Sequence, residues 1–178
     1  MVEEKRHILI CGERGVGKST LIEKLLQACP RPRYGFLTRM EPADEAGFHP
    51  IYIHPAAQPR EAWTYTDENR IGSCDSRTHL ARPEVFDALG VRLIREARPE
   101  GILVMDELGF FEAQAAAFTA AVLQALARDI PVIAAVKSRT DVPFLNAVRS
   151  MPKAEIFYIT RENRDQLLQE LLPRMKNL

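Results

Sequence analysis

A run of eight residues, Gly12-Glu-Arg-Gly-Val-Gly-Lys-Ser19, constrains the fold of this chain more than any other feature. It follows a short apolar segment at 7–11 and precedes a segment at 19–29 whose apolar residues recur at helical spacing. The pattern G-x-x-x-x-G-K-[ST] between a strand and a helix is typical of a phosphate-binding loop. A glycine-rich turn without a ligand is the alternative, but every fixed position and both flanking segments agree with the phosphate-binding motif.

The motif predicts a role for each kind of residue in the loop. Lys18 is expected to reach the β- and γ-phosphates of a nucleotide and to take part in catalysis, and the Ser19 hydroxyl is expected to ligate Mg²⁺. The predicted nucleotide contacts are Gly12, Glu13, Arg14, Gly15, Val16, Gly17, Lys18, Ser19 and Thr20.

A phosphate-binding loop needs an acidic partner at the end of a buried strand, and Ile102-Leu-Val-Met-Asp106-Glu107 supplies two candidates. Asp106 is predicted to hold Mg²⁺, and Glu107 to orient and polarise the water that attacks the γ-phosphate. The alternatives are a solvated acid at a strand end for Asp106 and simple placement at a helix entrance for Glu107. The adjacent Asp-Glu pair indicates the ATPase-like (RecA-like) branch, in which an extra strand separates the two phosphate-binding strands.

Apolar segments alternate with helical patterns along most of the chain, which predicts one α/β domain over residues 1–178 with three layers: a mostly parallel sheet with helices on both faces. Further strands are expected at 34–39, 48–54, 62–66, 101–105, 131–136 and 155–159, and further helices at 83–97, 112–128, 142–149 and 164–175. The first three of these strands predict a small antiparallel insertion or a sheet edge, and 67–81 is expected to be a loop.

Composition narrows the partners and the compartment. Lys+Arg and Asp+Glu both number 24, and this balance argues against a protein that coats nucleic acid or binds a membrane surface. Three cysteines without Cys-x-x-Cys spacing indicate reduced thiols. The acidic start at 1–6 and the lack of a run of ~20 apolar residues predict neither a signal peptide nor a membrane helix. We therefore expect a cytoplasmic protein, monomeric or weakly oligomeric, without a clear nucleic-acid partner.

The sequence contains no guanine-reading Asn-Lys-x-Asp motif where a GTPase would carry it. The segment after the strand at 131–136 is Lys137-Ser-Arg-Thr-Asp141, in which Lys and Asp are too far apart. Broad use of ATP, GTP and other nucleoside triphosphates is therefore expected. Lys137 either touches the γ-phosphate from the strand end or is a solvated lysine.

Several segments carry a resemblance over nearly the whole length. They are Gly15-Val-Gly-Lys-Ser-Thr20, Gly35-Phe-Leu-Thr38, Asp106-Glu-Leu-Gly109 followed by Glu112, Pro131-Val-Ile-Ala, and Ile159-Thr-Arg-Glu-Asn-Arg-Asp165. With them the chain resembles the small thermophile-type, or cancer-related, nucleoside-triphosphatase family. The resemblance implies a compact ATPase-like domain that hydrolyses several nucleoside triphosphates slowly with Mg²⁺.

The resemblance also implies that the loop at 160–165 lies near the nucleobase, which makes Asn163 and Arg164 candidate binding residues. The alternative is that Asn163 only caps a helix, with Gln166 as its partner.

The chain departs from the family pattern at two positions. Phe110 stands where the family usually has lysine, so that charge is lost or moved. Arg14 stands where proline is common, and it either reaches phosphate or faces solvent. Arg70, Arg77 and Arg82 lie in a segment that resembles the family weakly, and each is a candidate arginine finger.

Three functions stay open at this point. The first is Mg²⁺-dependent hydrolysis of nucleoside triphosphates to diphosphate and phosphate. The second is a kinase that passes the γ-phosphate to a small molecule or nucleoside, with the insertion at 34–66 framing the acceptor. The third is a nucleotide-gated binding module with very slow turnover.

Overall fold

The structure is a computed structural model that describes residues 5–178. Residues 1–4 lie outside the described residues. They belong to the predicted domain and to the acidic start of the chain, which predicted no signal peptide. The strands are β1 (His7–Gly12), β2 (Arg33–Met40), β3 (His49–Pro55), β4 (Arg70–Cys74), β5 (His79–Ala81), β6 (Ile102–Leu108), β7 (Val132–Lys137) and β8 (Ala154–Tyr158).

The helices are α1 (Lys18–Ala28), α2 (Pro83–Val85), α3 (Val91–Arg95), α4 (Ala116–Ala127), α5 (Pro143–Arg149) and α6 (Arg164–Lys176). Three short turns of other helix types are the 3-10 turns η1 (Arg60–Ala62) and η3 (Phe111–Gln114) and the π turn η2 (Phe86–Gly90). Within residues 5–178, none of these helices combines the length and the apolar character that crossing a membrane requires.

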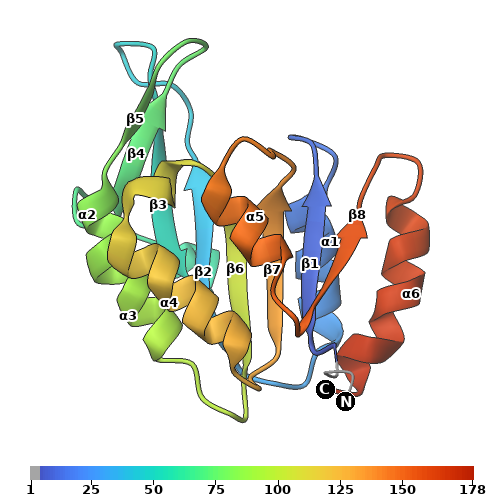
Figure 1. Cartoon of the computed structure of the whole chain (residues 1–178). Coiled ribbons are helices and arrows are strands. Elements are labelled where there is room, and N and C mark those ends of the chain that lie inside the picture. The colour runs from blue at the N-terminus through green and yellow to red at the C-terminus, as the bar shows by residue number, and fades with distance from the viewer. Residues whose placement is uncertain (1–4) are drawn as a thin grey trace.

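All of the strands join one mixed sheet in the order β5-β4-β3-β2-β6-β7-β1-β8 (Figure 1). The pairs β2–β6, β6–β7, β7–β1 and β1–β8 are parallel. The pairs β2–β3, β3–β4 and β4–β5 are antiparallel. The predicted mostly parallel sheet with an antiparallel addition is confirmed. Because β7 lies between β1 and β6, the extra strand of the ATPase-like branch is present too.

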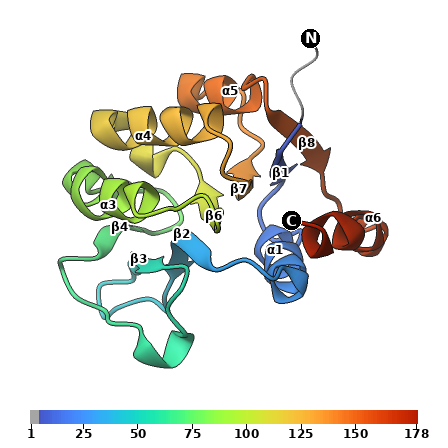
Figure 2. The ribbon, with the colours of Figure 1, turned by 90° about the horizontal axis from the view of Figure 1, so that it is seen from below.

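Helices cover both faces of the sheet, as predicted for three layers. Viewed from below in Figure 2, α1 and α6 lie on one face and α3, α4 and α5 on the other. The central strands are apolar on both faces, as a sheet covered twice requires. Each face has its own hydrophobic core, one packed under α1 and α6 and the other under α3, α4 and α5.

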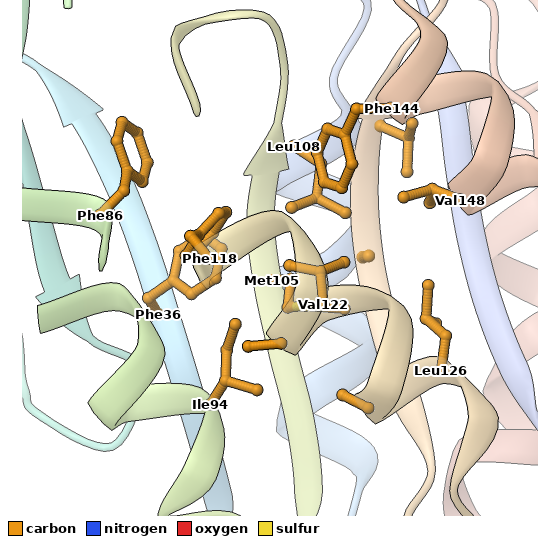
Figure 3. Packing of buried hydrophobic residues seen from close by; sticks show 14 of the residues in the cluster. Phe36, Phe86, Ile94, Met105, Leu108, Phe118, Val122, Leu126, Phe144 and Val148 are labelled. Atoms are coloured by element: carbon orange, nitrogen blue, oxygen red, sulfur yellow. The ribbon is translucent and has the colours of Figure 1, made fainter. Parts of the chain in front are cut away.

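The larger core is centred on aromatic side chains near the antiparallel end of the sheet. The ring of Phe118 from α4 lies 5.5 Å from that of Phe36 in β2 and 5.0 Å from that of Phe86 in η2 (Figure 3). All three side chains are fully buried, and burial of a large apolar side chain contributes ~1.5–3 kcal/mol. This packing fixes β2 against the helices and so positions the residues at its carboxyl end.

The prediction of a strand at 62–66 is wrong. The segment is irregular after η1, and its alternating aromatic residues pack on β3 instead of pairing as a strand. Trp63 stacks on His54 with ring centroids 4.1 Å apart, and Tyr65 meets Tyr52 edge-on at 5.1 Å. The alternation of aromatic residues thus arises because one side of this irregular segment packs against β3.

The prediction of a loop at 67–81 is also wrong, because the segment contains β4 and β5. Both strands are short, and β5 lies exposed at the sheet edge, so neither gives a period-two signal. At Gly72 the two backbones come so close that a Cβ would lie 2.3 Å from the carbonyl oxygen of Leu80. A glycine that permits such an approach also lowers the strand propensity read from the sequence.

The helices expected at 83–97 and 112–128 are both present, each with an irregularity. The first consists of α2, the π turn η2 and α3. The second begins as η3, and the extended backbone of Ala115 separates this turn from α4.

Candidate active site

The phosphate loop joins the carboxyl end of β1 to the start of α1. Gly17 precedes the first helical residue with φ of 107°, a left-handed conformation that favours glycine. Among the described residues, no side chain caps the first turn of α1. The N–H groups of that turn therefore point into the loop, where an anion can accept their hydrogen bonds.

Lys18 lies inside this loop with only 6% of its surface exposed. Its Nζ donates to the carbonyl oxygens of Gly12 and Glu13, each at 2.9 Å, and lies 3.2 Å from Oε2 of Glu107. The ammonium group is thus held above the loop and beside the acid that follows Asp106.

Ser19 and Asp106 form the second part of the site. The Ser19 hydroxyl donates to Oδ1 of Asp106 at 2.8 Å, which brings the loop and the end of β6 together. Asp106 is 1% exposed, and burial raises the pKa of its carboxyl, against the opposing effects of the Arg39 guanidinium and the Ser19 hydrogen bond. A buried carboxylate next to a hydroxyl supplies the oxygen ligands that Mg²⁺ prefers. The residues present therefore fit a magnesium ion.

Glu107 lies between two lysines. Its Oε2 faces Lys18 as described, and its Oε1 lies 3.6 Å from Nζ of Lys137 at the end of β7. The Glu107 side chain is 26% exposed, so solvent reaches it while its charge is balanced from both sides. Lys137 is thus held beside Glu107 instead of standing free in solvent, and its contact with the γ-phosphate stays a prediction.

Thr38 and Arg39, at the end of β2, support the acidic pair from the neighbouring strand. The Thr38 hydroxyl donates to the carbonyl oxygen of Asp106 at 3.2 Å and accepts from the backbone N–H of Glu107 at 3.1 Å. Arg39 lies 3.4 Å from Oδ2 of Asp106. Sequence reasoning assigned no role to either residue. Their position at the end of a strand beside β6 is the signal that points to them, and it requires the strand order.

Glu112 lies behind this group, in the 3-10 turn η3 that follows β6. It is 2% exposed, and its Oε1 accepts a short hydrogen bond from the backbone N–H of Gly109. Burial raises the pKa of its carboxyl to about 7. Glu112 thus shapes the turn that leads away from Glu107.

The ring of Phe110, in that same turn, faces two cations. Nζ of Lys137 lies 4.8 Å and Cζ of Arg139 lies 4.9 Å from the ring centroid. This turn therefore has positive charge beside it, although Phe110 replaces the lysine that is typical of the resembled family. The charge comes from the end of β7 and the following loop.

The two residues predicted near the nucleobase differ in how they are held. Arg164 lies beside the phosphate loop, with Cδ 3.9 Å from the place that a Cβ on Gly17 would occupy, and it lines a 210 Å³ cavity with Gly17 and Thr20. Asn163 accepts from the N–H of Thr160 at 2.8 Å and donates to the carbonyl oxygen of Tyr158 at 2.9 Å. Asn163 occupies the N-cap position of α6, as the helix-cap alternative predicts, but its side chain makes no capping bond to the described residues of that helix.

The remaining loop residues surround the phosphate-binding turn. Glu13 accepts from the Ser138 hydroxyl at 2.9 Å, and Val16 packs against the core under α1. Arg14 is exposed and directs its guanidinium toward the sulfur of Met40 at 3.6 Å. This arrangement places Arg14 over the end of β2, beside the site.

The candidate arginine fingers lie elsewhere. Arg70 and Arg82 line a separate 380 Å³ cavity that none of the phosphate-loop residues borders, and Arg82 pairs with Glu84 at 3.0 Å. Arg77 lies in the turn between β4 and β5, bonded through its N–H to Asp75. Among the described residues, the arginine that reaches the acidic pair is Arg39.

Comparison with known proteins identifies the family of the chain. Residues 7–172 match a family described as NTPase. Nucleoside-triphosphatase THEP1 of Aquifex aeolicus is 27% identical over 176 residues, which cover 93% of this chain and 96% of the relative. A cancer-related nucleoside-triphosphatase homolog of Bos taurus is 27% identical over 193 residues, covering 97% of each chain.

A solved structure shares the fold. The crystal structure of THEP1 from the hyperthermophile Aquifex aeolicus superposes with a TM-score of 0.72 at 23% identity, covering 96% of this chain and 99% of that one. The sequence match over nearly the whole length and the shared architecture agree with the phosphate loop and the acidic pair described above. This chain belongs to the NTPase family.

Proposed function

We propose that this protein hydrolyses nucleoside triphosphates to the diphosphate and phosphate in a Mg²⁺-dependent reaction with broad base specificity. One observation carries the proposal: the Glu107 carboxylate lies 3.2 Å from Lys18 and 3.6 Å from Lys137, directly after Asp106 and beside the phosphate loop. The family and the names of the relatives support the same reaction.

The phosphate loop binds the substrate. The N–H groups at the start of α1 hold the β- and γ-phosphates, and Lys18 turns from the carbonyl oxygens of Gly12 and Glu13 toward them. Ser19 and Asp106 would hold Mg²⁺, which would neutralise charge on the phosphates. Arg39 lies at Oδ2 of Asp106 and Ser19 at Oδ1, so the ion would share this carboxylate with both side chains.

Glu107 activates the attacking water. Its carboxylate accepts a hydrogen bond from the water and takes the proton as the oxygen approaches the γ-phosphorus from the side opposite the β-phosphate. The hydrogen bond from the Glu107 backbone N–H to the Thr38 hydroxyl fixes the backbone from which this side chain extends. Lys137 faces the same carboxylate and stabilises the negative charge that spreads over the transferring group.

The base side of the site is open. Thr20 and Arg164 line the small cavity beside Gly17, and we assign the ribose and base to this side, with Asn163 shaping the loop. Loose contacts of this kind discriminate bases weakly. The proposal also includes the predictions that residues 1–178 are one domain, that the protein is cytoplasmic, and that it is a monomer or a weak oligomer.

Phosphate release without an added acceptor tests the reaction. With Mg²⁺ and excess ATP, the wild type is expected to release many equivalents of phosphate per protein, and EDTA is expected to stop the release. GTP and pyrimidine triphosphates should be hydrolysed within about a decade of ATP, since each buried base hydrogen bond that discriminates is worth ~1–3 kcal/mol. Release of one equivalent or less would contradict hydrolysis, and a preference above about a hundredfold would contradict broad specificity.

A further inference from the structure

A further cavity, with a volume of 400 Å³, opens beside Glu107 and next to the phosphate loop. From that loop only Arg14 borders it, whereas Glu107, Thr38 and Lys137 form its edge toward the site. The cavity is therefore adjacent to the place where the γ-phosphate is transferred, yet it is not the nucleotide site.

The antiparallel strands and the loop after β6 build this cavity. Its walls include Ile51 of β3, Ile71 of β4, Phe86 of the π turn, and Phe110 and Phe111 after β6. At the upper left of Figure 1, the β4–β5 hairpin reaches beyond β2 at the same edge of the sheet. The insertion thus encloses space next to the acidic pair.

Most of the exposed lining is apolar and aromatic, and the polar or charged side chains that border the cavity are Arg14, Thr38, His79, Glu107, Glu112 and Lys137. A volume in the range of ~300–1,000 Å³ with this kind of lining is typical of sites for small molecules. Hydrolysis needs only one ordered water at Glu107, so a water-using reaction gives no reason for an apolar chamber of this size.

The charges around the cavity indicate a neutral ligand. Glu107 is balanced by two lysines, and Glu112, the other carboxyl that borders the cavity, has a pKa raised to about 7 by burial. Arg14 and Lys137 stand at the edge toward the phosphates, where a triphosphate supplies the opposite charge. Two of the charged groups on the lining, Glu107 and Lys137, thus already balance each other.

We propose that this cavity binds a second substrate, a neutral small molecule with an aromatic or other apolar body and one hydroxyl group, which receives the γ-phosphate in place of water. The inference rests on the proposed function of the phosphate loop and Glu107. The apolar body fills the cavity and excludes water, and the hydroxyl lies at Glu107.

The transfer step is balanced in atoms and electrons. The hydroxyl oxygen forms a bond to the γ-phosphorus, and the bond from that phosphorus to the β-phosphate oxygen breaks. The electron pair of the broken bond stays on the nucleoside diphosphate, and the hydroxyl proton passes to Glu107 and then to solvent. The products are a phosphomonoester and the diphosphate, and free phosphate forms when water occupies the cavity instead.

The experiment measures how the γ-phosphate partitions between water and an alcohol. The full-length protein is incubated with Mg²⁺, ATP and millimolar benzyl alcohol, 2-phenylethanol or 3-phenyl-1-propanol, and both phosphomonoester and free phosphate are quantified by phosphorus NMR and mass spectrometry. At least one of these alcohols is expected to yield its phosphomonoester with the wild type.

Variants that fill the cavity identify where transfer occurs. Ile71→Trp is expected to lower ester formation at least about tenfold while leaving phosphate release within about threefold, because it removes the acceptor's space and not the phosphate site. Ile51→Phe fills less of the cavity and replaces Ile71→Trp in this test if that variant does not fold. Leu80→Trp places the same ring on the neighbouring strand, at a side chain that is 53% exposed and outside the cavity, and should change neither product.

Two results would overturn the inference while leaving the proposed function intact: ATP hydrolysis without ester from any of the three alcohols, or undiminished ester formation by a folded cavity-filling variant. Failure of the wild type to consume ATP at all would instead overturn the proposed function and this inference together.

Discussion

At the scale of single residues, the site is a set of charges that compensate one another. The Lys18 ammonium is held by two loop carbonyl oxygens and by Glu107, and the buried Asp106 by Ser19 and Arg39. Each of these contacts occupies a group that the phosphates or Mg²⁺ would engage. Under the proposed function, substrate binding would exchange these contacts for contacts with the phosphates and Mg²⁺, so that buried charges keep partners.

Lys18→Ala is expected to weaken the binding of nucleoside triphosphates about 10–100-fold, because a charge-assisted hydrogen bond contributes ~1.5–3 kcal/mol. Turnover should fall as well, since the same ammonium stabilises the transferring group. Titration with a fluorescent ATP analogue measures the affinity, and Lys176→Ala, at an exposed position in the last turn of α6, is the control. Equal affinity and turnover of Lys18→Ala and wild type would contradict the assignment of the phosphate loop.

Glu112→Gln is expected to change the pH dependence of stability. The pKa of the folded carboxyl is raised from 4.5 to about 7, so its contribution to stability is fully present below about pH 4.5 and is lost as the pH rises through 7. Glutamine keeps an oxygen for the Gly109 N–H but does not ionise. From pH 4.5 to 8 the variant should gain on the order of 3 kcal/mol relative to wild type.

Urea unfolding of both proteins at several pH values measures this difference. A difference between Glu112→Gln and wild type that stays constant from pH 4.5 to 8 would show that burial does not hold the Glu112 proton.

At the scale of elements, sequence patterns predicted the features that depend on one continuous stretch of the chain. The phosphate loop, the acidic pair and the alternation of buried strands with helices each occupy a continuous stretch, so the α/β class and the positions of Lys18, Ser19 and Asp106 followed from the sequence. Thr38 and Arg39 did not, because they matter only through the pairing of β2 with β6. Strands β4 and β5 were missed because their pairing with each other and with β3 stabilises segments too short for a periodic signal.

The aromatic segment after η1 covers β3, where it packs on a buried histidine. The His54 side chain is stacked on Trp63, and within the described residues its Nε2 has no hydrogen-bond partner. Burial, assisted by the nearby Arg39 charge, lowers the pKa of His54 from 6.5 to about 4. The imidazole is therefore neutral in the folded protein, and its protonation favours unfolding.

His54→Phe is expected to make the protein more resistant to acid. A lowered pKa in the folded state contributes stability that is present above pH 6.5 and is lost as the pH falls through 4. Phenylalanine retains the stacking on Trp63 without a group to protonate, so it should gain up to about 3 kcal/mol relative to wild type between pH 7 and pH 4. Chemical denaturation across this range checks the result, and parallel acid-induced losses in both proteins would contradict it.

At the scale of the whole molecule, the strand order gathers the site at one edge of the sheet. The ends of β1, β7 and β6 contribute the phosphate loop, Lys137 and the acidic pair, and β2 adds Thr38 and Arg39 from the next position. The antiparallel strands then extend this edge and enclose the cavity beside Glu107. The parallel strands thus carry the phosphate loop and the acidic pair, and the antiparallel strands form walls of the neighbouring cavity.

The central claim is that Glu107 activates the nucleophile, and Glu107→Gln tests it most directly. Glutamine keeps the length of the side chain but cannot accept the proton or balance the two lysines. Phosphate release is expected to fall about 10²–10⁴-fold, or ~3–5 kcal/mol in barrier. Affinity for Mg²⁺ and nucleotide should hardly change, because the attacking water contributes little to ground-state binding.

Single-turnover phosphate release, measured together with equilibrium nucleotide binding, separates these two effects. The control is Glu100→Gln, an exposed glutamate before β6 that should retain full activity. The account predicts that Glu107→Gln binds the triphosphate as wild type does and releases almost no phosphate. Hydrolysis by Glu107→Gln within about threefold of wild type would contradict the account, because another group would then position the water.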